Sequence, residues 1–197
     1  MNPKSEIDLV EGVRRGEEAA FDAIYHRYGR RVYGFTYRMT LNSGVAEDVT
    51  HDTFLVLIEQ PERFQVERGS LLTFLCAVAR NLVMNHLRRK HNRDVRLDDF
   101  EDFDIPEVGT SGNPLASLLD QELVARIDAC IAALPPMQRE VIILREYEEL
   151  SYEEIANITD TELGVVRARL FRARQNLAKG LAAYINVPKK DKCYELQ

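Results

Sequence analysis

The sequence lacks several features that would define a function at once. No apolar run approaches the roughly 20 residues that a membrane-spanning helix needs, and the first ten residues are too charged for a signal peptide. The cysteines, Cys76, Cys130 and Cys193, show neither metal-ligand spacing nor a disulfide framework. We therefore expect a cytoplasmic protein with no membrane insertion and no metal site.

Catalytic signatures are also missing. The sequence contains no nucleophile paired with a base and no glycine-rich loop that could cradle a phosphate. Its four histidines share no metal-ligand spacing: His26, His51, His86 and His91. We expect no enzymatic activity, no cofactor and no small-molecule substrate.

The net charge of −6 argues at first against nucleic-acid binding, but the charge is unevenly distributed. Residues 98–120 contain seven acids and no bases, so the rest of the chain has 26 bases and 25 acids. Bases concentrate in residues 80–96 and 167–179. Phosphate responds to local patches, because charges beyond about 10 Å are screened. For either run alone, a solvated helix face is the simpler interpretation.

Residues 98–114, DDFEDFDIPEVGTSGNP, have the composition of a flexible acidic linker. They separate residues 1–97 from residues 115–197, and helical periodicity dominates both parts. The sequence thus predicts an all-α protein of two small helical domains.

Apolar spacing and breakers place the helices. In the first part we expect one helix carrying Phe21 to Met39, then helices near 45–59 and 70–90. In the second part we expect helices near 115–133 and 138–148. A capping box at Ser151–Glu154 then starts a short helix. Asp160 supplies a left-handed turn residue, and a helix near 162–184 completes a helix-turn-helix.

The last helix has two contrasting faces. At about 100° per residue, its apolar residues fall within one arc, while Arg167, Ala168, Phe171 and Arg172 lie opposite, flanked by Arg169 and Arg174. Arginine can bind guanine edges in the major groove, and flanking arginines can hold phosphates. A surface helix made soluble by arginines is the alternative, but it leaves Phe171 unexplained.

Residues 70–90 also divide into an apolar arc and an outward arc that combines aromatic, amide and basic residues. Such a face can stack unpaired bases and neutralise phosphate. The alternative is that Phe74 packs against a neighbouring helix. The outward arc contains Thr73, Phe74, Arg80, Asn81, Met84, Asn85 and Arg88.

An acidic stripe follows one face of the helix near 45–59. Asp48, Asp52, Leu55 and Glu59 recur at spacings of four, three and four, which places them on one side. The stripe is either a solvated face or a protein-binding surface.

In this order, the motifs resemble the extracytoplasmic-function (ECF) class of bacterial sigma factors, in the sigma-70 family. The resemblance covers nearly all of the chain outside the linker and the two ends. In this family, His51 is usually Gln and Asp160 is usually Gly. The segments that carry the resemblance are Ala46–Phe54, Thr73–Asn81, Leu87–Arg89, Leu134–Glu140, Ser151–Ala156 and Gly164–Arg174.

The resemblance implies a role for each part. Residues 1–97 would be sigma region 2 and residues 115–197 sigma region 4, with core RNA polymerase, promoter DNA and an anti-sigma factor as partners. The polymerase-binding residues would be Asp48, His51, Asp52 and Leu55. The minus-ten element would meet Arg63, Phe64, Phe74, Arg80, Asn81, Asn85, Arg88 and Arg89. The minus-thirty-five element would meet Arg167, Ala168, Arg169, Phe171, Arg172 and Arg174.

Two other classes remain as alternatives. One is an adaptor that binds only protein and carries a decayed helix-turn-helix. The other is a conventional DNA-binding regulator whose first part senses a signal or dimerises. The acidic stripe and the face around Phe74 speak against the second.

Overall fold

The computed structural model of the chain describes residues 5–94 and 114–182, and every regular element in these ranges is helical. The absence of strands from the described residues confirms the predicted all-α class. Residues 98–113 of the expected linker lie outside the described part. In the described ranges, no helix has the length and apolarity needed to cross a membrane.

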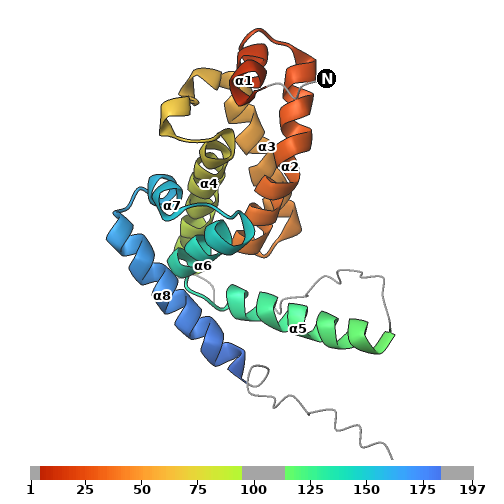
Figure 1. Cartoon of the computed structure of the whole chain (residues 1–197), viewed down its shortest axis with the longest axis vertical. Coiled ribbons are helices and arrows are strands. Elements are labelled where there is room, and N and C mark those ends of the chain that lie inside the picture. The colour runs from red at the N-terminus through yellow and green to blue at the C-terminus, as the bar shows by residue number, and fades with distance from the viewer. Residues whose placement is uncertain (1–4, 95–113, 183–197) are drawn as a thin grey trace, which may run out of the picture.

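The described residues before the linker form four α-helices with two short 3-10 turns between the third and fourth (Figure 1). The expected helices are all present, with shifted ends. The elements are α1 (Glu6–Arg14), α2 (Glu18–Thr40), α3 (Ser43–Glu59), η1 (Pro61–Arg63), η2 (Val66–Arg68) and α4 (Leu71–Asp94).

The described residues after the linker form four more α-helices. The helix expected at 138–148 is α6 followed by a π-helical turn, η3, and the last helix ends at Gly180 instead of near 184. The elements are α5 (Pro114–Ala132), α6 (Pro136–Ile142), η3 (Ile143–Tyr147), α7 (Tyr152–Thr159) and α8 (Leu163–Gly180).

Local side chains explain several helix ends. Leu41 closes α2 in a left-handed conformation, and the side chain of Asn42 caps α3 by accepting a hydrogen bond from the Val45 amide at 2.9 Å. The predicted capping box of α7 is present, because Ser151 and Glu154 each accept the other's amide hydrogen. These interactions fix where the chain turns.

Helix α1 was missed by the sequence analysis. Its signal is a second capping box, in which Ser5 and Asp8 each accept the other's amide hydrogen. Leu9 and Val10 on α1 are buried, and the Tyr28 hydroxyl of α2 donates to the Glu6 carboxylate. The first helix of the first part therefore begins at Glu6, before the helix that the apolar pattern predicted.

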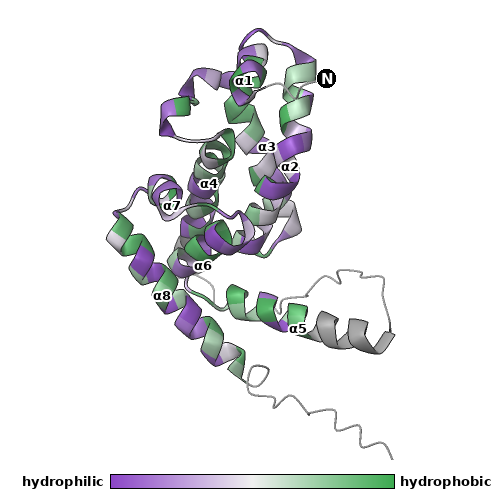
Figure 2. Ribbon diagram, viewed as in Figure 1, coloured by the Kyte–Doolittle hydropathy of each residue, from purple (hydrophilic) through white to green (hydrophobic). Residues whose placement is uncertain are grey.

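The buried side chains of both parts belong to one continuous cluster. Phe35, Phe54 and Leu75 are buried where α2, α3 and α4 pack together, and Ile143 and Leu170 are buried between α6, η3 and α8. Helix α7 packs against α4, which brings the two parts side by side (Figure 1). Helix α8 alternates hydrophilic and hydrophobic residues along its length, as an amphipathic helix does (Figure 2).

The turn between α7 and α8 contains the residue that the sequence predicted to be left-handed. Asp160 has φ 51° and ψ 51°, so the predicted left-handed residue is confirmed. We expect Asp160→Gly to be neutral or stabilising and Asp160→Val to cost about 1–2 kcal/mol, because a branched side chain is strained at this φ. Urea unfolding of the two variants measures the difference. Equal stabilities would show that the turn tolerates any residue.

Candidate nucleic-acid interface

The recognition face expected on α8 is open to solvent. Val166, Leu170 and Ala173 are buried, as the helical projection predicted. Arg167, Ala168, Phe171 and Arg172 are all exposed on the other side, and 64% of Phe171 is accessible. An aromatic ring this exposed contributes little to the fold, and it can be reached from solvent together with Arg167 and Arg172.

The two flanking arginines differ from each other. Arg174 forms an exposed ion pair with Glu146 at 2.7 Å. Arg169 turns inward, where its guanidinium donates to Glu140 at 3.1 Å, and only 17% of its side chain is exposed. Of the two positions predicted to meet phosphate, only Arg174 lies on the open surface.

The expected outward arc of α4 is exposed over only part of its length, and this corrects the sequence analysis. Asn81, Asn85 and Arg88 are exposed, and so is the adjacent Arg89. Thr73 is buried, however, and Arg80 is mostly covered. The physical reason is that α6 and α7 pack over this side of α4, which the projection of a single helix cannot reveal.

The aromatic residues expected to handle single-stranded DNA pack on each other. Phe64 is 6% exposed, and its ring meets that of Phe74 edge to face, with centroids 6.0 Å apart. Phe74 itself is half-buried. Arg63, on the same loop, is exposed and donates to the Gln60 side chain at 3.3 Å. In this conformation the loop supplies an exposed cation, while its aromatic ring is covered.

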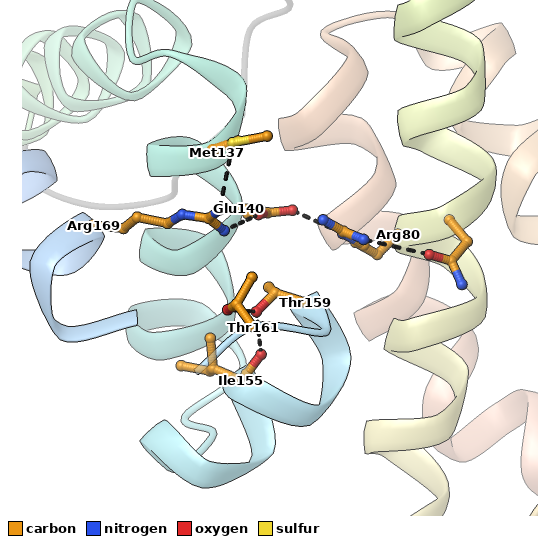
Figure 3. A network of polar contacts seen from close by, with 8 residues as sticks. Arg80, Met137, Glu140, Ile155, Thr159, Thr161 and Arg169 are labelled. Atoms are coloured by element: carbon orange, nitrogen blue, oxygen red, sulfur yellow. Dashed lines mark hydrogen bonds and ion pairs between the residues drawn. The ribbon is translucent and has the colours of Figure 1, made fainter. Parts of the chain in front are cut away.

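Glu140 occupies the centre of a polar network between the two parts of the chain (Figure 3). Its carboxylate is fully buried, and its two oxygens accept from Arg80 on α4 at 2.9 Å and from Arg169 on α8 at 3.1 Å. Burial raises the pKa of Glu140 above its ordinary value, although both arginines act in the opposite direction. A charge in this position requires its cationic partners, because alone it would be strongly destabilised.

Other polar contacts join the same two parts. The Thr73 hydroxyl donates to Glu154 on α7 at 3.0 Å, while Arg31 on α2 pairs with the buried Glu148 at 2.8 Å. Burial tends to raise the pKa of Glu154, but hydrogen bonds from Ser151 and Thr73 lower it overall. Sequence analysis missed Glu140, Glu148 and Glu154 as contact residues. No local pattern predicts these contacts, since the partners in the first part lie 60 to 117 residues away.

The partly buried guanidinium of Arg139 connects the end of α2 to the second part. Arg139 donates to the backbone oxygens of Met39 at 3.0 Å and Leu134 at 3.1 Å, and also to that of Ala132. Met39 and Ala132 lie in the last turns of α2 and α5, where unpaired carbonyls concentrate negative partial charge. Burial lowers the pKa of Arg139 from its ordinary value.

The acidic stripe on α3 lies on the surface, as predicted. Asp48, Asp52 and Glu59 are exposed and Leu55 is half-buried, so the four can be reached together. His51 is exposed beside them, at the edge of an open groove of about 530 Å³ between α2 and α3. The groove is lined by Tyr25, His26, Arg30, Tyr33, Glu47 and His51, among others.

Comparison with known proteins connects these surfaces to a family. A model of sigma-70 region 2 matches residues 24–93, and a model of sigma-70 region 4 matches residues 125–177. The RNA polymerase sigma-H factor of Pseudomonas aeruginosa is 32% identical over 186 residues, covering 92% of this chain and 96% of the relative. The ECF RNA polymerase sigma-E factor of Escherichia coli is 34% identical, covering 85% and 89%.

Solved structures share the fold. The sigma factor RpoE of Bartonella quintana, crystallised with the anti-sigma factor NepR, aligns with a TM-score of 0.68 at 22% identity and covers 82% of this chain and 96% of its own. CnrH, in complex with the cytosolic domain of CnrY, aligns with a TM-score of 0.66 at 20% identity and covers 91% and 99%.

The fold and its basic helix faces define an all-helical transcription factor with a helix-turn-helix. The chain belongs to the sigma-70 family, in its ECF class, and is thus a transcription initiation factor of RNA polymerase. The family resemblance inferred from the motif order is confirmed.

The buried position of Glu140 makes a prediction about stability. Glu140→Gln should lower the free energy of unfolding by about 3 kcal/mol, because two partly buried guanidiniums then lose their shared carboxylate. Glu146→Gln, in the exposed pair with Arg174, should cost about 0–1 kcal/mol. Chemical denaturation of the two isosteric variants provides the comparison. Equal losses would mean that the network contributes no more than a surface pair.

Proposed function

We propose that the two parts of this sigma factor divide the work of promoter recognition. Residues 1–97 act as region 2, residues 115–197 act as region 4, and residues 98–114 connect them. The family-model matches, which fall on either side of the connecting residues, support this division. The protein acts in the cytoplasm, where the DNA and polymerase are, and has no catalysis of its own.

The observation that best supports a DNA role is the exposed face of α8. Arg167, Ala168, Phe171 and Arg172 present two arginines, a methyl group and a ring on one side of a helix preceded by a tight turn. This is the composition that reads a major groove, because arginine recognises guanine and apolar groups contact the thymine methyl. The face reads the minus-thirty-five element.

Helix α4 and the loop before it recognise the minus-ten element. Asn81 and Asn85 can hydrogen-bond to base edges, and exposed Arg63, Arg88 and Arg89 can hold phosphates. Phe64 and Phe74 supply aromatic faces for unpaired bases once they separate from each other. Arg80 joins them when its contact with Glu140 is released.

The acidic stripe binds core RNA polymerase. Asp48 and Asp52 are exposed on consecutive turns of α3. Leu55 follows Asp52 on the same face and precedes Glu59, and His51 lies beside this stripe. Charged groups around one apolar side chain are suited to a specific protein interface. An anti-sigma factor controls the protein. The solved structure of similar fold from Bartonella quintana, which contains a sigma factor in complex with the anti-sigma factor NepR, supports this.

Polymerase binding can be tested by charge reversal. Asp48→Arg combined with Asp52→Arg should abolish co-purification with core polymerase, because attraction is replaced by repulsion. Glu18→Arg combined with Asp22→Arg makes the same charge change, with the same spacing, on exposed positions of α2 and should retain binding. Circular dichroism verifies that both are folded. Normal recovery of polymerase with the first variant would contradict the assignment of the stripe.

Base reading by α8 can be tested with a promoter library. Arg172→Ala should relax preference at one base pair of the minus-thirty-five element, at a cost of about 1–3 kcal/mol. Arg174→Ala should weaken transcription evenly across sequences, because Arg174 lies beside the reading face and contacts Glu146. Transcription by core polymerase with each variant gives the two profiles. If both variants shift base preference equally, or neither does, the reading face is wrong.

A further inference from the structure

Glu6, in the first turn of α1, bonds to two segments that lie far from it in the chain. One carboxylate oxygen accepts a hydrogen bond from the backbone amide of Leu71 at 2.9 Å, and the other accepts from the Tyr28 hydroxyl of α2. Leu71 is the first residue of α4, where amides have no partner within the helix. A carboxylate is stabilised at this end of a helix, because the helix dipole is positive there. Glu6 therefore holds the start of α4 from a position 65 residues earlier.

Local chemistry keeps Glu6 in this position. Ser5 and Asp8 form the capping box that begins α1, so Glu6 lies in an ordered first turn. Further along α1, a Cβ atom at Gly12 would lie 2.6 Å from the Cβ of Ala20, so α1 packs on α2 with no room for a side chain at this point. Both ends of α1 are thus fixed against the rest of the first part.

The loop between α3 and α4, residues 60–70, has few anchors of its own. Phe64 is its only buried side chain, and the Phe64 ring meets that of Phe74 near the start of α4. These two rings are the ones proposed to receive unpaired bases, which requires them to separate. Helix α1 supports the same loop at both ends, because it packs against η1 and holds Leu71 through Glu6. The Glu6 hydrogen bond involves neither ring, so it is compatible with their separation.

We infer that Glu6 is a positioning residue for minus-ten recognition, because it holds the start of α4 so that Phe74 and the loop present their aromatic faces to unpaired bases. The inference rests on the proposed function of α4 and this loop. It adds α1, which carries none of the residues assigned to DNA, to the parts of the chain that determine how those bases are held. Glu6 acts through the α4 backbone, since both of its oxygens accept hydrogen bonds within the chain and its charge repels phosphate.

Three variants distinguish positioning from a general loss of stability. Glu6→Ala removes both hydrogen bonds. Glu6→Gln keeps an oxygen that can accept from the Leu71 amide, so it should retain the function. Glu11→Ala is the matched control on the same helix, because it removes a carboxylate that forms an exposed pair with Arg14 at 3.1 Å. Circular dichroism and co-purification with core polymerase verify that each variant is folded and bound.

The assay measures how the full chain, bound to core polymerase, holds individual bases. Promoter templates are opened in advance by mismatches over the minus-ten element, and each base of one strand is replaced in turn by an abasic site. With the unmodified chain, an abasic site at a held base should weaken binding about tenfold, because it removes a stacking contact with an aromatic ring. With Glu6→Ala the same site should weaken binding less than about twofold, since the rings no longer hold that base.

Glu6→Gln and Glu11→Ala should keep the tenfold cost of the abasic site. A variant that is merely less stable would bind all templates more weakly by one common factor and would also keep that cost. A tenfold cost that persists in Glu6→Ala would therefore overturn the inference, and so would its loss in Glu11→Ala.

A second variant covers the case in which Glu6→Ala does not fold. Tyr28→Phe removes only the hydroxyl that orients the Glu6 carboxylate and should reduce the cost of the abasic site to about threefold. An unchanged tenfold cost in Tyr28→Phe would then contradict the positioning role. If no abasic site affects the unmodified chain, the proposed function of α4 and the loop is itself refuted. Failure of the proposed function is thus distinguished from failure of the positioning role, which appears only in the variants.

Discussion

The shared carboxylate of Glu140 sets the arrangement on which the other contacts between the two parts depend. It lies on α6, in the second part of the chain. It accepts one hydrogen bond from Arg169 on α8 of the same part and one from Arg80 on α4 of the first part. A buried carboxylate is strongly destabilised when it loses a cationic partner. The two ion pairs therefore hold α4, α6 and α8 in fixed positions relative to one another. The packing of α7 along α4 and the Thr73–Glu154 hydrogen bond then extend the same interface.

This arrangement relates fold to function through charge. The faces proposed to bind DNA are basic, and Glu140 neutralises part of that charge internally, because its carboxylate pairs with Arg80 of α4 and Arg169 of α8. The exposed face of α8 around Phe171 stays available, while the covered part of α4 does not. The two faces proposed to read the promoter elements therefore differ in how much of each is exposed in this structure.

Local chemistry explains which features the sequence could predict. The capping box at Ser151, the left-handed turn at Asp160 and the two faces of α8 depend on residues close to one another in the chain, and all three are confirmed. The direction of Arg80 and Arg169 depends on where α6 comes to lie, which no helical projection contains. Thr73 was predicted on the outward arc because the projection of α4 alone cannot show that α7 covers it, and in the structure Thr73 is buried. The capping box of Ser5 and Asp8 could have predicted helix α1, but the apolar face of this helix is too short to give a clear periodic signal.

A double-mutant cycle between Arg80 and Glu140 tests the central claim most directly. Arg80→Ala, Glu140→Gln and the double variant are unfolded by denaturant, and the coupling free energy is taken from the four stabilities. The account predicts a coupling of about 1–3 kcal/mol, because the two residues share a buried hydrogen-bonded ion pair across the interface. Additivity of the two single changes to within about 0.3 kcal/mol would contradict it, because the carboxylate would then not join the two parts.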